Sequence, residues 1–247
     1  MSIMPMNNDD SITIAMASIP ERAGGMAAVL RTLLPQCDYF DLCLNGYPMG
    51  FHCAEMDDPK VTIFRHSRDM GDRGKFIMAN RVKGYYLTVD DDLLYPGDYA
   101  YRTVQAIESY QRQAIVGWHG TIYVVTPDPS QPKMRCMYFF LEARPEDVLV
   151  HHLGTGCMGY HTSCFQVDWR TMVQGVDDQV GWMAQQQCVP MIVIRHGLRE
   201  IEENPACAEV GAYKRNLRII EESFRREQSH NWNLVICDSW KSKRVCC

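Results

Sequence analysis

The sequence has no apolar run that approaches the roughly 20 residues a membrane-spanning helix needs. It also lacks a stripe of basic residues, and its 25 Lys and Arg are outnumbered by 30 Asp and Glu, for a net charge of −5. Proteins that bind nucleic acid through phosphate contacts need clustered cations, so this balance argues against a nucleic-acid partner. The negative charge is compatible with a phosphate-bearing substrate that is met by a metal ion and a few local cations.

Paired cysteine motifs are missing as well. Eleven cysteines are scattered along the chain without a Cys-x-x-Cys pair, which argues against a zinc site. Many lie inside apolar runs, where a free cysteine behaves as a small hydrophobic residue. The first ten residues have neither the cationic head nor the apolar core of a signal peptide. We therefore expect a reducing, cytoplasmic location.

The last seven residues, 241–247, are basic and end in Cys246 and Cys247. A disordered tail is the simpler interpretation. The alternative is lipidation or weak association with an anionic membrane surface.

The order of the expected elements favours an α/β fold. Apolar and β-branched runs predict strands, and apolar residues at helical spacing predict the helices between them. The alternation predicts a three-layer αβα sandwich with a mainly parallel, Rossmann-like sheet. The strands are expected at 11–17, 41–45, 61–64, 85–89, 114–118, 137–141, 148–151 and 190–194, with 137–141 and 148–151 as an antiparallel pair, and the helices at 26–34, 76–82, 99–113, 179–188 and 212–228.

The stretch from Tyr85 to Asp92 is the main candidate for a functional site, and the other features are interpreted relative to it. A run rich in aromatic and β-branched residues leads directly into Asp90, Asp91 and Asp92. A buried strand that ends in carboxylates delivers them to the rim of the sheet, where open α/β folds bind ligands. Three like charges repel unless a cation lies between them, and a divalent ion with oxygen ligands is a suitable one. The alternative is a solvated acidic turn that continues to Asp98.

Three further groups carry charge or polar atoms near expected strand ends. Asp177 and Asp178 precede a helix, where they serve as a general base or simply favour the helix N-terminus. The loop 68–75 offers Arg73 and Lys75 to phosphates and Asp69 and Asp72 to a base or ribose, or is a charged surface loop. His119 follows the expected strand 114–118 and should lie near the rim of the sheet. Trp118 at the end of that strand could form a platform for a sugar ring, although burial of the tryptophan is the commoner outcome.

These features in this order resemble the nucleotide-sugar-dependent glycosyltransferases of the GT-A fold, in particular their family-2-like group. The resemblance covers about residues 11–197 and starts from a first strand and loop that read Ile14-Ala15-Met16-Ala17-Ser18-Ile19-Pro20-Glu21-Arg22. An Asp-x-Asp motif follows the fourth strand, then a Gly-rich segment at 154–160 and the acidic pair at 177–178. The Gln-x-x-Arg-Trp signature of processive members is absent, so we expect transfer of one sugar per acceptor.

The resemblance implies a nucleoside diphosphate-sugar donor, with a UDP-sugar as the working expectation, a glycan acceptor and Mn²⁺ or Mg²⁺ as cofactor. It assigns the catalytic base to Asp178 or Asp177, with Asp178 slightly preferred, and we expect an inverting reaction, since a retaining route needs no dedicated base. It implies metal ligation by Asp92, Asp90 and His196, donor binding by Ser18, Pro20, Glu21, Arg22, Asp69, Asp72, Arg73, Lys75, Asp90 and Asp91, and acceptor binding by Trp118, His119, Gly154, Thr155 and Gly156.

The expected organisation is a short N-terminal segment (1–10), a catalytic domain (11–197) and a C-terminal extension (198–247). Within the catalytic domain, 11–92 would bind the nucleotide and 93–197 the acceptor. Three alternatives stay open: a sugar-nucleotide pyrophosphorylase-like nucleotidyltransferase, a catalytically silent sugar- or nucleotide-binding domain, and an unrelated Rossmann-type protein. A pyrophosphorylase would need a Gly-rich phosphate loop directly after the first strand, where this chain has 18–22 instead.

Overall fold

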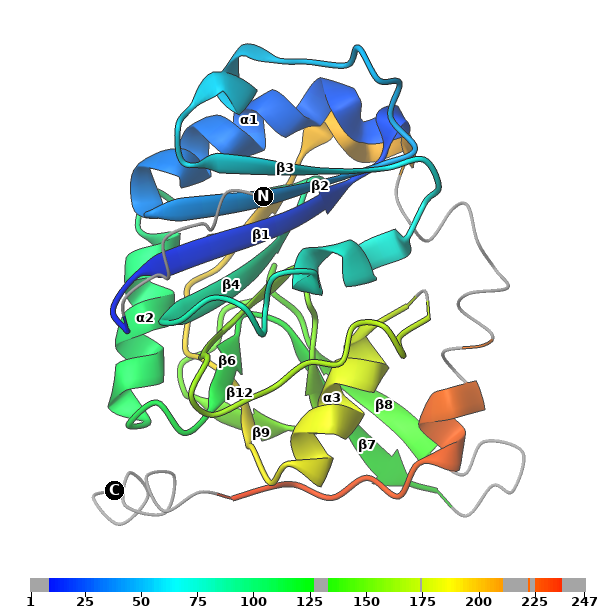
Figure 1. Ribbon diagram of the computed structural model, residues 1–247. Coiled ribbons are helices and arrows are strands. Elements are labelled where there is room, and N and C mark those ends of the chain that lie inside the picture. The colour runs from blue at the N-terminus through cyan, green and yellow to red at the C-terminus, as the bar shows by residue number, and fades with distance from the viewer. Residues whose placement is uncertain (1–8, 127–132, 174, 211–221, 223–224, 237–247) are drawn as a thin grey trace.

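A computed structural model describes residues 9–126, 133–173, 175–210, 222 and 225–236 (Figure 1). Its centre is an eight-stranded sheet with the strand order β3-β2-β1-β4-β11-β6-β12-β9. Six of these strands run in one direction, and β11 and β9 run against them. The strands are β1 (Ile12–Ser18), β2 (Tyr39–Asn45), β3 (Val61–His66), β4 (Tyr85–Asp90), β6 (Ile115–Gly117), β9 (Val148–Val150), β11 (Cys157–His161) and β12 (Met191–Val193).

Helices cover both faces of this sheet (Figure 1). The first face is covered by α1 (Ala23–Leu33) and α2 (Tyr99–Ser109), and their buried residues share one core cluster with β1, β2 and β4. The second face is covered by the 3₁₀ helix η4 (Gly71–Phe76) and by α3 (Asp177–Gln186), whose apolar residues belong to another cluster. The predicted three-layer α/β fold with a mainly parallel sheet is therefore confirmed.

The strand order places a topological switch point between β1 and β4. The chain passes from β1 outward to β2 and β3, then returns to the other side of β1 to form β4. Ala17 at the end of β1 lies opposite Asp90 at the end of β4. The loops that follow two such strands leave in opposite directions, so a crevice opens at their carboxyl ends, where open α/β sheets bind ligands.

Two smaller sheets complete the fold. Strand β7 (Gly120–Val125) pairs with β8 (Lys133–Tyr138) and with β10 (His152–Leu153), and β5 (Leu93–Leu94) pairs with β13 (Glu202–Glu203). The expected pairing of 137–141 with 148–151 is wrong, because β8 pairs with β7 whereas β9 joins the edge of the main sheet beside β12. Alternating apolar residues predict a strand, but they do not name its partner.

The expected helix at 76–82 is also wrong. The chain forms η4 over Gly71–Phe76 and then a series of turns, in which Ala79 and Arg81 donate backbone hydrogen bonds to carbonyls three residues earlier. A 3₁₀ helix repeats every three residues, so its apolar spacing resembles that of a short α-helix. Most of the expected helix 212–228 and the basic tail lie outside the described residues.

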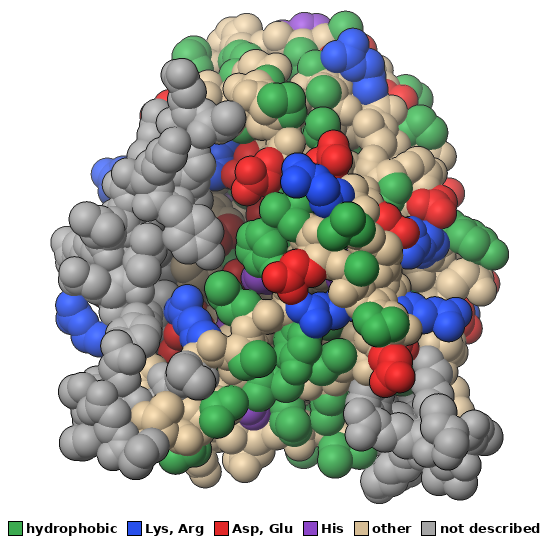
Figure 2. Space-filling view, turned by 180° about the vertical axis from the view of Figure 1, so that it is seen from behind, with side chains coloured by type: hydrophobic (Ala, Val, Ile, Leu, Met, Phe, Trp, Pro, Cys, Tyr) green, Lys and Arg blue, Asp and Glu red, His purple; other side chains and the backbone are tan. Residues whose placement is uncertain are grey.

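No helix in the described part of the chain is both long and apolar enough to cross a membrane. On the face shown in Figure 2, Lys and Arg side chains lie among acidic and apolar ones and do not gather in a stripe.

Candidate functional site

The three carboxylates after β4 are divided between the crevice and the core. The side chains of Asp90 and Asp92 are 33% and 24% exposed, whereas that of Asp91 is 1% exposed. Side chains alternate in an extended chain, so the first and third face the same side and the second faces the other. The hydroxyl of Tyr95 lies beneath them: it accepts a hydrogen bond from the Asp90 amide at 2.7 Å and donates to the carbonyl of Gly156.

Lys75 lies in the middle of the acidic residues. Its ammonium forms an ion pair with Asp90 and lies 3.4 Å from the carbonyl of Thr155, and only 2% of the side chain is exposed. Burial opposes charge on Lys75, but Asp90 and Asp72 outweigh it and raise its pKa. The pKa of Asp90 is lowered, because Lys75 overcomes the effect of burial. A side chain at position 156 would collide with the Asp90 carboxylate, so only glycine fits there.

Arg22 holds the other two carboxylates. It lies at the end of the 3₁₀ turn η1 (Pro20–Arg22), which directly follows β1. Its Nη1 donates to Asp91 at 2.7 Å, and its Nη2 lies 2.8 Å from Asp92. Burial and the neighbouring charge of Asp90 still raise the pKa of Asp92 to about 7. The Arg22 Nε is buried and has no hydrogen-bond partner among the described residues.

Asp177 and Asp178 begin α3 and face different surroundings. Asp177 accepts hydrogen bonds from the amide and the hydroxyl of Thr155, at 2.9 and 2.7 Å, both on Oδ1. Burial and the charge of Asp72 raise its pKa to about 6. Asp178 is 1% exposed and forms an ion pair with Arg226 on the opposite side. Asp177 therefore faces the end of β4, and Asp178 faces away from it.

Five carboxylates and two cations thus share one edge of the sheet. We call this set the acidic edge; it comprises Asp72, Asp90, Asp91, Asp92, Asp177, Lys75 and Arg22. With every group ionised it has an excess of negative charge, which favours the uptake of a cation.

A metal ion at this edge would need ligands beyond the chain. Within the described ranges, no group of three or more His, Cys, Asp or Glu side chains is arranged to hold an ion by itself. The partly exposed Asp92 has the oxygen chemistry that Mg²⁺ and Mn²⁺ prefer. The residues present therefore fit an ion that is bound by one or two carboxylates and completed by substrate phosphates and water.

His196, expected as a further metal ligand, belongs to no such group. It is 6% exposed, its ring lies 5.5 Å from that of Trp118, and its Nδ1 bonds the carbonyl of Gly197 at 3.1 Å. Its Nε2 is buried without a partner among the described residues. Burial lowers the pKa of His196, which favours the neutral ring.

The remaining residues expected at the donor differ in position. Ser18 is buried at the end of β1, with its hydroxyl 2.7 Å from that of Tyr47, whereas Pro20 and Glu21 are exposed. Asp69 is exposed and accepts a hydrogen bond from the Gly71 amide at 2.7 Å. Arg73 donates to the carbonyls of Met70 and Met172, which joins η4 to the segment before α3. Of the loop 68–75, Asp72 and Lys75 reach the acidic edge.

The residues expected at the acceptor are split as well. Trp118 is 0% exposed, with the ring of Tyr99 tilted against it and the guanidinium of Arg102 over its face, so the expectation of a sugar platform there is wrong. His119 lies against Gly154, whose amide donates to the His119 carbonyl at 3.0 Å. The rings of Phe139 and Phe140 meet His119 edge-on, and burial lowers its pKa to about 4. Thr155 and Gly156 contact Asp177 and Asp90, so they lie beside the acidic edge.

Two further features were not expected from the sequence. Tyr95 was interpreted as part of an acidic turn, yet it fixes the end of β4. The segment 202–207 lies beside the acidic edge, because the Asn204 amide donates to the Asp92 carbonyl at 2.7 Å and its side chain donates to Gly25. The signal available for Tyr95 was an aromatic residue shortly after the carboxylates, separated from them by Leu93 and Leu94. Segment 202–207 carried no such signal.

Comparison with known proteins leaves the family open. No family model matches the chain, and no curated protein matches it. Solved structures do match, among them the crystal structure of 4-diphosphocytidyl-2C-methyl-D-erythritol synthase. The match has 9% sequence identity and a TM-score of 0.48, and it covers 82% of this chain and 96% of that one. A likeness at this level leaves the activity to be argued from the chain itself.

Proposed function

We propose that the chain is a transferase that acts on a nucleotide-linked substrate and binds its phosphates at the acidic edge. The observation that carries this proposal is the group of carboxylates at the switch point of the sheet, in excess over Arg22 and Lys75. Ligands of open α/β sheets bind at this place. An excess of carboxylates there favours a substrate that arrives with a divalent cation.

The first version of this function is glycosyl transfer from a nucleoside diphosphate-sugar. A Mg²⁺ or Mn²⁺ ion held by Asp92, with Asp90 beside it, would stabilise the diphosphate leaving group as a Lewis acid. Arg22 is placed to pair with a phosphate once Asp91 and Asp92 share their charge with a cation.

Asp177 is the better candidate for the base that accepts the proton of the acceptor hydroxyl. Thr155 fixes its Oδ1, and no described residue binds its Oδ2. A pKa near 6 keeps the carboxylate ionised at pH 7 and makes it a stronger base than an exposed aspartate. Asp178 is bound to Arg226 and faces away, which supports a structural role instead.

The second version is nucleotidyl transfer, in which a sugar phosphate or alcohol phosphate attacks a nucleoside triphosphate. The buried ammonium of Lys75 favours it, because a cation fixed beside Asp90 would stabilise charge on the attacked phosphate. The name of the matched structure, a synthase of a diphosphocytidyl compound, is closer to this version than to glycosyl transfer. The absence of a Gly-rich loop after β1 favours the first version.

Calorimetric titration with UDP, GDP, dTDP and CMP, each with and without Mn²⁺, tests the shared proposal. We expect one nucleotide to bind only with the metal, and to bind at least about tenfold more weakly to Asp92→Asn. The matched control is Asp57→Asn, because Asp57 is an exposed carboxylate that pairs with His52 and is not part of the acidic edge. Binding that is equal with and without metal would overturn the role of Asp92.

Product analysis then separates the two versions. Release of a nucleoside diphosphate from a nucleotide-sugar supports glycosyl transfer. Release of pyrophosphate from a nucleoside triphosphate and a sugar phosphate supports nucleotidyl transfer. Binding without either product would leave a silent nucleotide-binding domain.

A further inference from the structure

The C-terminal segment 225–236 lies along α3 and holds its first turn. We call this segment the clasp. Arg226 contacts both carboxylate oxygens of Asp178, with Nε 2.9 Å from Oδ2 and Nη2 3.1 Å from Oδ1. The same Nη2 is 2.9 Å from the carbonyl of Gly175, just before the helix. A two-pronged contact of this kind fixes orientation as well as distance.

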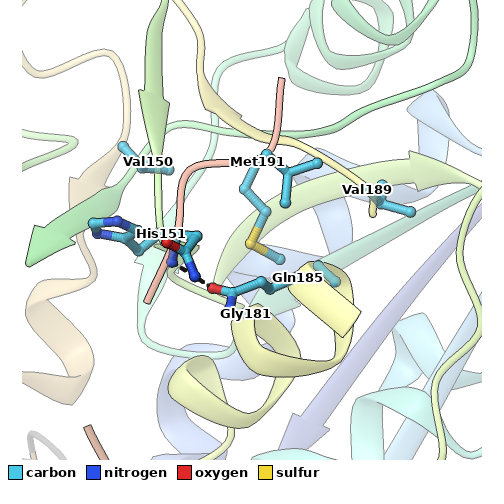
Figure 3. A pocket seen from close by; sticks show the side chains of 9 residues that line it. Val150, His151, Gly181, Gln185, Val189 and Met191 are labelled. Carbon is cyan, nitrogen blue, oxygen red and sulfur yellow. Dashed lines mark hydrogen bonds between the residues drawn. The ribbon is translucent and has the colours of Figure 1, made fainter. Parts of the chain in front are cut away.

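The clasp holds the other end of α3 too. The side-chain amide of Gln185 donates to the Asn231 carbonyl at 2.8 Å and accepts from the Asn233 amide at 2.7 Å. Figure 3 shows Gln185 beside a small pocket that is bounded by Gly181 of α3, by Val150 and His151, and by Val189 and Met191. The ring of His230 stacks on Trp182 at 4.2 Å. The helix is therefore fixed along its length.

A second ion pair anchors the clasp to the β7–β8 hairpin. Glu227, 2% exposed, accepts two hydrogen bonds from Arg135 of β8. Trp232 donates its indole N–H to the Glu227 carbonyl at 2.9 Å and stacks on Tyr123 of β7. These contacts give Arg226 a rigid support from which it holds Asp178.

The two sides of the first turn of α3 are thus held by different parts of the chain. Thr155 binds Asp177 from the acidic edge, and Arg226 binds the adjacent Asp178 from the clasp. The two residues share the backbone of this turn, so the ion pair restricts the position and direction of the Asp177 Cα–Cβ bond, from which the Thr155 bonds then orient the carboxylate. The position of a reacting group matters, because a displacement of about 1 Å can cost about a hundredfold in rate.

We infer that Arg226 is a positioning residue, which acts through Asp178 to aim the Asp177 carboxylate at the acceptor hydroxyl. This inference rests on the proposed transfer function and on Asp177 as its base. It assigns the clasp a part in the reaction that is exerted through the first turn of α3.

The test compares Arg226→Gln, Arg226→Lys and a matched control, Gln185→Ala, which loosens the far end of the same helix. For Arg226→Gln we expect kcat to fall by about tenfold to a hundredfold with the donor KM unchanged, and Arg226→Lys to recover part of that loss. We also expect the acid limb of kcat to move to lower pH, since a loosened turn lets water reach Asp177 between Asp72, Lys75 and Thr155. Gln185→Ala should keep both the rate and the pH profile.

Hydrogen exchange gives a readout that does not depend on activity. In Arg226→Gln, amides in the first turn of α3 should exchange faster, while those of α1 and β1 keep their rates. If the wild-type protein binds no nucleotide, the proposed function fails, but faster exchange still supports the clasp. The inference is overturned if Arg226→Gln keeps the wild-type pH profile and exchange, or if it lowers the rate of an Asp177→Asn variant as much as it lowers that of the wild type.

Discussion

Asp177 and Asp178 are adjacent in the chain, yet they belong to two regions that differ in how their carboxylates are neutralised. At the acidic edge, five carboxylates share Arg22 and Lys75, and the pKa values of Asp92 and Asp177 are raised. At the clasp, Asp178 is paired with Arg226 and Glu227 with Arg135. The clasp therefore has its acids neutralised one by one, whereas the edge keeps a surplus.

The difference separates a region that holds the fold from one that is prepared for a ligand. A buried acid with its own arginine is stable when nothing else is bound, but removal of either partner leaves an unpaired buried charge. A surplus of acids raises the free energy of the empty site, and a bound cation relieves it. Single substitutions at the edge should therefore remove chemistry directly, whereas those at the clasp should lower stability and affect the rate only through the position of Asp177.

The largest effect on activity is expected for Asp177→Asn. A general base contributes about 10² to 10⁴ in rate, so transfer should fall by that order while nucleotide binding stays within about twofold. In the wild type the rate should rise as pH increases through about 6, because the pKa of Asp177 is raised to that value and only the ionised form accepts a proton. Steady-state kinetics between pH 5 and 8 measure both the rate loss in the variant and the pH dependence of the wild type, whose apparent pKa is compared with that of an unperturbed aspartate. Near-normal transfer by the variant would remove Asp177 from the mechanism.

Asp178→Asn should instead lower the free energy of unfolding. Breaking a buried ion pair by removing one partner costs about 3–5 kcal/mol, because the Arg226 charge is left without its carboxylate. Urea denaturation measures the change, and the surface pair of His52 and Asp57 provides a control, since Asp57→Asn should change stability by less than about 1 kcal/mol. Equal losses for both variants would show that the clasp pair is no more stabilising than a surface pair.

Asp92→Asn tests the acidic edge directly, and its expected effect is smaller than those of the two variants above. Affinity for the nucleotide with Mn²⁺ should fall by about tenfold or more, which corresponds to about 1.4 kcal/mol. Thermal stability without ligand should not fall, because burial and Asp90 already disfavour the Asp92 charge. Calorimetry and a melting curve on the same sample give the two values. A variant that loses stability but keeps its affinity would place Asp92 with the clasp residues.

The architecture was largely predictable, because it follows from local patterns. Met26, Val29, Leu30 and Leu33 have helical spacing, and α1 buries all four. The run before Asp90 is a buried strand, as its composition predicted. Strand pairing was less accessible, since it depends on contacts between distant segments; the β7–β8 pair shows this.

The candidate site was predictable where the residues are close in sequence and not where they are distant. The alternation of Asp90, Asp91 and Asp92 follows from strand geometry alone. The choice between Asp177 and Asp178 depends on Arg226, which lies 48 residues further along the chain. The burial of Trp118 likewise depends on α2, which covers it with Arg102.

The variant Asp41→Asn tests whether a buried carboxylate without a partner is enough to create a ligand-binding site. Asp41, on β2 opposite Ala15, has a buried Oδ2 with no partner among the described residues, and burial raises its pKa to about 7. An acid whose folded pKa lies above its unfolded value favours the folded state below the unfolded pKa, and this advantage is lost as pH rises through about 7. The variant should therefore gain stability relative to the wild type as pH rises from about 4 to about 8, as measured by urea denaturation at both ends of that range.

Nucleotide affinity should be unchanged in Asp41→Asn, since Asp41 lies on the face of the sheet beneath η4 and not at its carboxyl edge. Titration with the nucleotide and Mn²⁺ checks this. Unchanged affinity with higher stability at pH 8 means that a surplus of acids at the switch point, and not burial of a lone carboxylate, distinguishes the acidic edge. A loss of affinity would mean that Asp41 on β2 also contributes to ligand binding, and the contrast between the acidic edge and the clasp would be weaker.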